Sequence, residues 1–195
     1  FEYAKDKNQA INNLKKIKYY MAIKFNQLRK KFSGKKVLVT GHTGFKGSWL
    51  ALMLKFLGAK VIGVSDKLVS SPSHFQIIKD KINIKNYFFD IKNFKRFRKI
   101  INKEKPNFIF HLAAQSLVKK SYINPLDTWS TNLGGTINLL EILREFKKNC
   151  TVVFITSDKV YKNLETKRPY NENSILGGYD PYSCSKSSAD LAIQS

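Results

Sequence analysis

The stretch Lys36–Gly47, Lys-Val-Leu-Val-Thr-Gly-His-Thr-Gly-Phe-Lys-Gly, decides the fold of this chain. It opens with a short apolar run typical of a buried strand, and three glycines then recur at every third position. Gly41 permits a tight turn, Gly44 lets a pyrophosphate approach the backbone, and Gly47 lets a helix pack closely on the strand. A helix that begins here offers free N–H groups and a positive dipole end to phosphates. The stretch predicts a dinucleotide-binding strand–turn–helix unit.

Strand-like and helix-like segments alternate along the rest of the chain. Apolar runs predict strands over Lys36–Thr40, Lys60–Val64, Asn86–Phe89, Asn107–Leu112 and Thr151–Thr156. Helical spacing of apolar residues predicts helices over Phe45–Leu57, Phe94–Asn102, Leu126–Phe146 and Tyr182–Ile193. Such alternation is typical of a parallel sheet that is covered by helices on both faces. We therefore predict the α/β class, with a doubly wound, Rossmann-type parallel sheet.

Acidic residues follow the second and third predicted strands. An acid about 20 residues beyond the glycine turn is expected to bind the adenosine ribose, and Asp66 is the candidate. A plain turn residue is an equal alternative, and Lys67 beside it leaves both NAD and NADP open on charge alone. Asp90 and Ile91 end the third strand, where they would meet the adenine edge. The alternative for Asp90 is the N-cap of the next helix.

Tyr182 and Lys186 form a Tyr-x-x-x-Lys pair on one face of the last predicted helix. A phenol with an ordinary pKa near ~10 is a poor base at neutral pH. A cation one helical turn away favours the phenolate form. The pair is therefore a candidate catalytic base.

The run Thr156-Ser-Asp158-Lys159 stands at the end of the fifth predicted strand, where ligands bind in open α/β sheets. An adjacent acid and amine could together supply a proton donor and a base. The alternative is a surface salt-bridge pair that caps the following loop.

The chain is strongly basic. Its 195 residues include 35 Lys and Arg against 14 Asp and Glu, a formal net charge of +21. Lys outnumbers Arg, although base recognition and phosphate clamps favour Arg. We therefore interpret the charge as solvated helix faces and expect no specific nucleic-acid partner. Residues 1–34 are predicted to be a basic, weakly amphipathic helical leader, frayed or non-native, rather than a targeting arm.

Composition also excludes several classes of protein. The two cysteines, Cys150 and Cys184, cannot build a disulfide scaffold, which indicates a reducing compartment. No apolar run approaches the roughly 18–20 residues of a membrane span, and the first residues lack the apolar core of a secretory signal. We expect a cytoplasmic protein with no membrane partner and no metal site.

In these motifs the chain resembles the extended short-chain dehydrogenase/reductases that modify nucleotide sugars. The matching segments are VTGHTGFKGSWLALML (39–54), HLAAQSLVKKSY (111–122), TNLGGTINLLE (131–141), TSDKVY (156–161) and GGYDPYSCSK (177–186). Within that family it is most similar to the branch of 4,6-dehydratases that act on CDP-glucose. That branch carries Asp-Lys where Asp158-Lys159 stand, whereas the dTDP-glucose branch carries Asp-Glu.

The resemblance implies that NAD and a nucleotide sugar bind at the carboxyl edge of the sheet. The residues implied for NAD are Gly41, Thr43, Gly44, Phe45, Gly47, Asp66, Asp90, Ile91, Leu112, Ala113, Ala114, Tyr182 and Lys186. The residues implied for the substrate, CDP-glucose, are Gln115, Ser116 and Asn132.

The resemblance also implies a reaction, the conversion of CDP-glucose to CDP-4-keto-6-deoxyglucose in deoxysugar and O-antigen-type polysaccharide biosynthesis. Tyr182 takes the proton from the sugar 4-hydroxyl as hydride leaves C4 for NAD, and Thr156 hydrogen-bonds O4. Lys186 holds the nicotinamide ribose. Lys159 removes the C5 proton, Asp158 protonates the departing 6-hydroxyl, and the hydride returns to C6.

The same resemblance implies that residues 35–195 are an NAD-binding domain that stops before its last strands and before a C-terminal substrate domain. The full-length protein is then expected to form a homo-oligomer. Two other functions stay open for the chain. One is a nucleotide-sugar 4-epimerase or reductase that needs only Tyr182 and Lys186, and the other is a non-catalytic cofactor-binding fragment.

Overall fold

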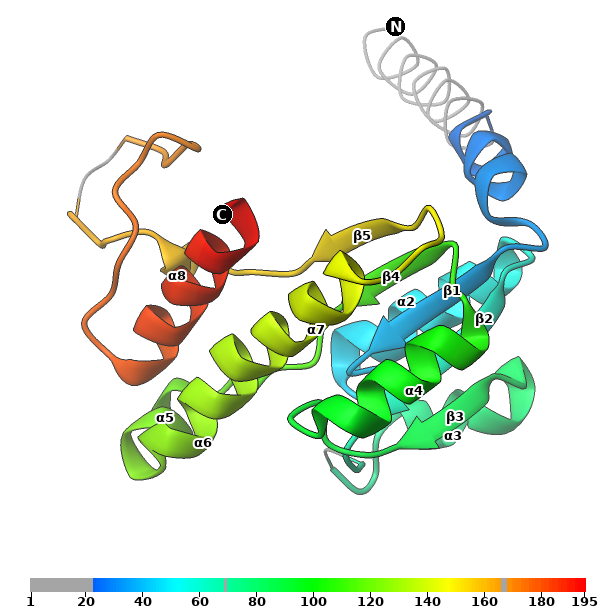
Figure 1. Ribbon diagram of the computed structural model, residues 1–195, viewed down its shortest axis with the longest axis horizontal. Coiled ribbons are helices and arrows are strands. Elements are labelled where there is room, and N and C mark those ends of the chain that lie inside the picture. Colours follow the sequence, from blue (N-terminus) through cyan, green and yellow to red (C-terminus); the bar gives the residue numbers. More distant parts are fainter. Residues whose placement is uncertain (1–22, 69, 166–167) are drawn as a thin grey trace, which may run out of the picture.

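A five-stranded, wholly parallel sheet forms the centre of the computed structural model, which describes residues 23–68, 70–165 and 168–195 (Figure 1). The strands are β1 (Lys36–Thr40), β2 (Lys60–Ser65), β3 (Lys85–Phe88), β4 (Phe108–His111) and β5 (Thr151–Phe154). Their order is β3-β2-β1-β4-β5, and all four pairings are parallel. The direction of winding reverses between β1 and β4, which places a crevice beyond the carboxyl ends of these two strands. The predicted fold class is confirmed.

Helices cover both faces of this sheet. The elements are α2 (Phe45–Phe56), α3 (His74–Ile82), α4 (Phe94–Glu104), α5 (Val118–Ile123), α6 (Pro125–Trp129), the π-helix η1 (Ser130–Gly134), α7 (Gly135–Arg144), the 3₁₀ turn η2 (Asp158–Val160) and α8 (Pro181–Gln194). In Figure 1, α8 and the segment before it stand beside α5, α6 and α7, beyond the β5 edge. No helix in the described ranges is both long enough and apolar enough to cross a membrane.

Two apolar cores lie on opposite faces of the sheet. Val37 and Val39 join the core under α2 and α3, whereas Leu38 between them joins the core under α4 and α7. Strands that are buried on both faces read as continuous apolar runs, which is why β1 shows no alternation of apolar and polar residues.

The single long helix predicted over Leu126–Phe146 is confirmed as continuous helix over 125–144, although a π-helical segment, η1, separates α6 from α7. Asn124 caps α6 by accepting a hydrogen bond from the Asp127 amide. The π-helix then turns Asn132 into the interior, where it is buried. Gly135 begins α7 against Ile91, and a Cβ at Gly135 would lie 2.3 Å from Ile91 Cδ1.

The sequence analysis did not predict α3 or α5. A signal for α3 was present, because the Ser73 hydroxyl caps it by accepting a hydrogen bond from the Gln76 amide. Its buried residues Phe75, Ile78 and Ile82 also recur at helical spacing. The short α5 contains two lysines and has one buried residue, Ser121, so it shows no apolar period.

The predicted leader lies partly outside the described residues, which begin at residue 23. Residues 23–32 are helical. Phe32 is buried against Phe108 and Phe110, with ring centroids 4.9 and 6.2 Å apart. The end of the predicted leader therefore packs onto the sheet.

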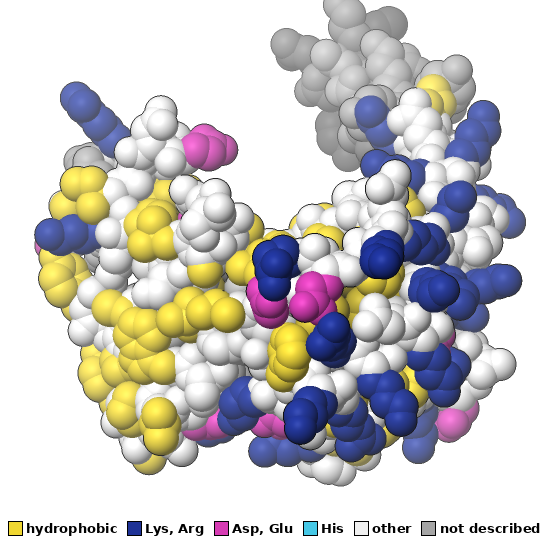
Figure 2. Space-filling view, in the orientation of Figure 1, with side chains coloured by type: hydrophobic (Ala, Val, Ile, Leu, Met, Phe, Trp, Pro, Cys, Tyr) yellow, Lys and Arg dark blue, Asp and Glu magenta, His cyan; other side chains and the backbone are white. Residues whose placement is uncertain are grey.

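Charged and apolar side chains gather on different sides of the surface (Figure 2). Lys and Arg crowd the side that carries the sheet and α4, whereas apolar side chains crowd the side of α5 to α8. Some lysines cap the ends of helices: Lys36 Nζ donates to the Glu104 carbonyl (2.9 Å) and Lys148 Nζ to the Lys105 carbonyl (2.7 Å), both at the end of α4. Positive charge stabilises a helix C-terminus, so part of the net charge serves the fold.

Candidate active site

The glycine turn joins β1 to α2 at the reversal of the sheet. Gly41 has a φ of +71°, and its amide donates to the Val64 carbonyl (2.7 Å). A Cβ at Gly47 would lie 2.1 Å from the Gly41 carbonyl oxygen, so no other residue fits there. Gly44 is the N-cap of α2 and no side chain caps this helix end. The turn therefore presents an open helix N-terminus to a ligand, as an anion site requires.

Thr40, the last residue of β1, ties the turn to the segment after β4. Its Oγ1 accepts hydrogen bonds from the amides of Leu112 (3.0 Å) and Ala113 (3.0 Å) and lies 2.9 Å from His111 Nδ1. The sequence analysis missed this role, although a polar residue at the end of a buried strand is a usable signal. The contacts of Thr40 fix the backbone of two residues that were predicted to bind the cofactor.

Asp66 follows β2 directly and stands beside the glycine turn. Its carboxylate is exposed and accepts a hydrogen bond from the Lys67 amide (2.8 Å). Thr43 links the turn to this strand end, because its hydroxyl donates to the Lys67 carbonyl (2.7 Å) and its amide to Ser65 Oγ (3.3 Å). The position suits a ribose contact, which stays a prediction.

Asp90 follows the third strand and is not a helix cap, so that alternative is wrong. The N-cap of α4 is Asn93, whose side chain accepts from the Arg96 amide (3.1 Å). The Asp90 carboxylate accepts instead from the Lys92 amide (2.9 Å) and remains partly exposed. Ile91 is buried against α7.

Tyr182 and Lys186 are both buried in the first half of α8. Asp180 caps this helix by accepting from the Ser183 amide (3.0 Å), and Pro181 occupies its first turn. Lys186 Nζ donates to the Ile155 carbonyl beyond β5 (3.0 Å). Burial, and secondly the positive charge of Lys46, lower the pKa of Lys186 to about 8. The influence of Lys46, in the first turn of α2, was not foreseen from the sequence.

The run after β5 carries Thr156, Asp158 and Lys159 toward α8. Ser157 Oγ accepts from the Lys159 amide (3.0 Å) and donates to the Asp158 carboxylate (3.1 Å). Asp158 and Lys159 are exposed, and among the described ion pairs none joins them. The salt-bridge alternative therefore does not hold for this pair.

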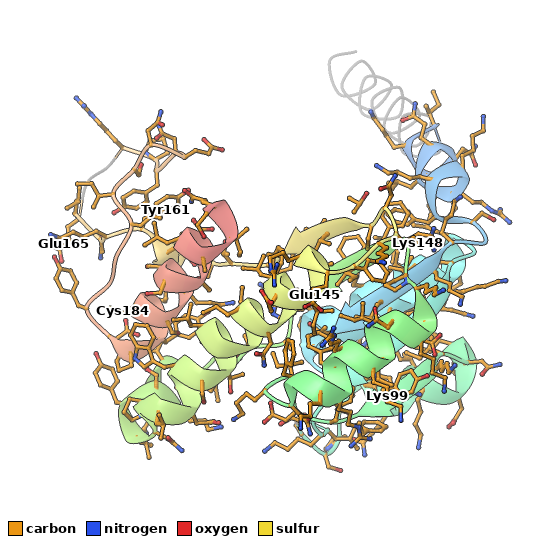
Figure 3. All side chains as sticks on the ribbon, in the orientation of Figure 1. Lys99, Glu145, Lys148, Tyr161, Glu165 and Cys184 are labelled. Carbon is orange, nitrogen blue, oxygen red and sulfur yellow. The ribbon has the colours of Figure 1, made fainter. Side chains whose placement is uncertain are left out.

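The segment around η2 is fastened to α8 close to Lys186. Ser187 Oγ donates to the Val160 carbonyl (2.7 Å). Ser187 follows Lys186 in the chain and Val160 follows Lys159, so this bond links the two segments. Tyr161 stacks on Tyr170, and Figure 3 shows Tyr161 beside α8, the helix that carries Cys184. Asp158 and Lys159 are therefore held next to α8, the helix that carries Tyr182 and Lys186.

The predicted substrate residues Gln115 and Asn132 contact each other. The Gln115 amide donates to Asn132 Oδ1 (2.8 Å), and Asn132 Nδ2 donates to the Gln115 carbonyl (3.1 Å) and to Ser185 Oγ (2.9 Å). Asn132 therefore joins the segment after β4 to α8. Ser116 is exposed. Substrate contact by these three residues stays a prediction.

One known protein family matches most of this chain. Residues 38–195 match the sequence pattern of the family described as GDP-mannose 4,6 dehydratase. The chain belongs to the GDP-mannose 4,6 dehydratase family. Its curated relatives include the CDP-glucose 4,6-dehydratase of Salmonella typhimurium, which is 47% identical over 82% of this chain and 45% of the relative.

Solved structures that resemble this member of the GDP-mannose 4,6 dehydratase family include epimerases. The epimerase Mth375 of Methanothermobacter thermautotrophicus matches with a TM-score of 0.75 and 30% identity, over 87% of this chain and 49% of that one. The UDP-glucose 4-epimerase of Bifidobacterium longum, in complex with NAD+ and UDP, matches with a TM-score of 0.70 and 26% identity over 82% and 48%. The chain spans about half the length of these relatives.

Proposed function

We propose that this chain is the cofactor-binding part of an NAD-dependent CDP-glucose 4,6-dehydratase. One observation carries the proposal: Asp158 and Lys159 lie on η2, where neither takes part in an ion pair with another described residue, and η2 is fastened to the helix of Tyr182 and Lys186. An epimerase needs only the Tyr/Lys pair, whereas a dehydratase also needs an acid and a base for the loss of water. The 47% identity to the Salmonella typhimurium enzyme supports the same substrate class.

The described residues fit NAD. The glycine turn leaves no room for a Cβ at Gly47, and an uncapped helix end faces the space where a pyrophosphate would lie. Gly41 and Gly44 would hold the pyrophosphate, Asp66 the adenosine ribose, and Asp90 with Ile91 the adenine. NAD, when bound, supplies the acceptor of hydride from the sugar and returns that hydride later. The NAD-bound epimerase of Bifidobacterium longum supports this assignment.

Tyr182 and Lys186 act at the oxidation step. Tyr182 takes the proton of the sugar 4-hydroxyl, and Thr156 hydrogen-bonds O4. Lys186 is held in place by the Ile155 carbonyl and keeps further N–H donors for a ribose hydroxyl. With a pKa of about 8, Lys186 is mostly charged at neutral pH and favours the phenolate form of a neighbouring tyrosine.

Asp158 and Lys159 act at the loss of water. A 4-keto group acidifies the C5 proton, which Lys159 removes, while Asp158 protonates the departing 6-hydroxyl. The two groups act on adjacent carbons, so they must stay apart from each other. The Ser157 hydroxyl donates to the Asp158 carboxylate and accepts from the Lys159 backbone amide, which orders the turn that carries both residues.

The test measures product mass. The full-length protein is incubated in turn with CDP-, dTDP-, UDP- and GDP-glucose and catalytic NAD, and the products are weighed. We expect loss of one water from CDP-glucose alone. An unchanged mass with an inverted sugar configuration by NMR would make the protein an epimerase. NAD binding without any conversion would make it a non-catalytic binding protein.

A 4-epimerase is the second candidate, favoured by the structural likeness to Mth375. Lys159→Ala separates the two functions. A dehydratase should lose at least about a hundredfold in rate with this change, as is typical when a general base is removed. An epimerase should keep its rate.

We further propose that the protein is cytoplasmic and forms a homo-oligomer without binding nucleic acid. The exposed apolar side chains of α5 and α6, among them Ile123 and Leu126, support self-association. The preference of the chain for Lys over Arg supports the absence of a nucleic-acid partner.

A further inference from the structure

The turn after β3, Phe89–Asn93, is fastened to the helices on its side of the sheet. The Asn138 side chain on α7 donates to the carbonyls of Ile91 (3.1 Å) and Lys92 (3.2 Å). The Asn93 amide donates to the Asp90 carbonyl (2.9 Å), which closes the turn on itself. The backbone that carries Asp90 is therefore fixed without help from the Lys92 ammonium.

A row of alternating charges runs from this turn to α5. Lys92 Nζ lies 3.3 Å from Asp90 Oδ2 and 2.8 Å from Asp127 Oδ1 on α6. Asp127 Oδ2 in turn lies 3.4 Å from Lys120 Nζ on α5. The hydrogen bond to Asp127 raises the pKa of Lys92, and the same contact lowers the pKa of Asp127. Both shifts favour the charged forms of Lys92 and Asp127.

The Asp90 carboxylate is consequently held at both of its oxygens by one residue. Oδ1 accepts from the Lys92 amide (2.9 Å) and Oδ2 faces the Lys92 ammonium. The Lys92–Asp90 contact is long, at 3.3 Å, and partly exposed, so by itself it contributes little to fold stability. Orientation is a better reason for this arrangement, because a carboxylate accepts about four hydrogen bonds and each Asp90 oxygen keeps a lone pair for a ligand.

We infer that Lys92 is a positioning residue for adenine: by bridging Asp90 to Asp127, it aims one Asp90 oxygen at the exocyclic amino group of the adenine ring. The inference rests on the proposed binding of NAD and names a residue outside the nucleotide contacts. Lys92 does not touch the ligand and acts only through the orientation of Asp90.

The experiment compares two dinucleotides that differ at one atom group. Nicotinamide hypoxanthine dinucleotide has a carbonyl where NAD has the adenine amino group, so it cannot donate to Asp90. Dissociation constants of both are measured by calorimetry for the wild-type protein and for Lys92→Met. We expect the preference for NAD to fall by roughly tenfold in the variant, as for the loss of one hydrogen bond to a charged group.

Two further variants separate the orientation of Asp90 by Lys92 from a general effect of losing one positive charge. Lys92→Arg can still bridge two carboxylates and should restore most of the preference. Lys99→Met removes the same charge from an exposed site on α4 (Figure 3) and should leave the preference unchanged. Thermal melting checks that every variant is folded.

The outcomes are distinguishable. Equal weakening of both dinucleotides in Lys92→Met, or an unchanged ratio, would overturn the positioning role while NAD binding stood. If the wild-type protein bound neither dinucleotide, the proposed function would fail, and this inference with it.

Discussion

At the scale of single residues, the geometry of the crevice depends on a few positions where close contacts restrict the residue type. Gly47 is such a position, because the Gly41 carbonyl oxygen occupies the space that a Cβ would need. Lys186 is another, since its side chain is buried and, among the described residues, its ammonium donates to one carbonyl. The sequence identified both residues from spacing alone. It could not show the environment of Lys186, which arises from segments distant in the chain.

Gly47→Ala tests the close packing of α2 on the glycine turn. We expect the free energy of unfolding to fall by about 1–3 kcal/mol, the usual cost of forcing an extra methyl into a packed site. The added methyl would meet backbone atoms, which cannot move aside easily, so the loss of free energy should lie at the upper end of this range. Gly134→Ala is the matched control, because nothing lies within 4 Å of a Cβ there. Gly134 is helical, so its replacement should be neutral or stabilising by up to ~1 kcal/mol. Equal urea midpoints for the two variants would contradict this account.

Lys186→Met tests the burial of the ammonium through the pH dependence of stability. Burial lowers the pKa of Lys186 from 10.5 to about 8 in the folded state. The unfolded chain then binds more protons between these two values, so burial destabilises the fold below about pH 8 and this cost fades as the pH rises. At pH 7 the variant should be more stable by on the order of 2 kcal/mol. The difference in free energy of unfolding between variant and wild type, measured with urea, should be smaller at pH 10 than at pH 7. An equal difference at both pH values would contradict a cost from burying the charged lysine.

At the scale of elements, prediction succeeded where one local pattern decided the structure. All five strands were predicted, with ends shifted by no more than two residues. The central strands β1 and β2 are mostly buried apolar runs, whereas the edge strands β3 and β5 contain no buried residue. The long helix over 126–146 was predicted, but its π-helical segment η1 was not, because the buried contacts of Asn132 belong to segments distant in the chain. Contacts between distant segments, such as Asn132 with Ser185, leave no local trace in the sequence.

Asn132→Ala tests whether η1 organises the site. The change removes bonds to the Gln115 backbone and to Ser185, and it leaves buried polar groups without partners. The free energy of unfolding should fall by about 3 kcal/mol, with unsatisfied groups causing most of the loss. Hydrogen exchange should rise in α8 beyond what global destabilisation explains. Ser116→Ala, at an exposed neighbour of Gln115, serves as the control and should change neither quantity.

At the scale of the whole molecule, the face seen in Figure 2 gathers basic side chains over the sheet and α4 and apolar side chains over α5 to α8. On the apolar side, Ile123 is 77% and Leu126 78% exposed. Large exposed apolar patches on soluble proteins commonly mark interfaces. Such a patch cannot be recognised from the sequence, because α5 shows no apolar period and α6 was merged into a longer helix.

The double variant Ile123→Asp with Leu126→Asp tests the proposed self-association. Placing two carboxylates on this surface should convert the oligomer to monomers, because a buried unpaired charge is costly at an interface. Light scattering during gel filtration would report the mass. Ile77→Asp, at an exposed apolar site on α3, is the control and should leave the mass unchanged. A wild-type protein that is already monomeric would contradict the proposal.

The contacts of Thr40 have one more consequence, for the state of His111. Thr40 Oγ1 accepts hydrogen bonds from two backbone amides, so both of its lone pairs are occupied and its own hydrogen points to His111 Nδ1. Nδ1 must then be the unprotonated nitrogen that accepts this hydrogen bond, and the neutral imidazole carries its hydrogen on Nε2. Burial lowers the pKa of His111 to about 3, so nitrogen-15 spectra should show this tautomer at any pH above about 4. Nε2 is buried without a partner among the described residues. One hydroxyl at the end of β1 thus decides where a hydrogen sits on the neighbouring strand.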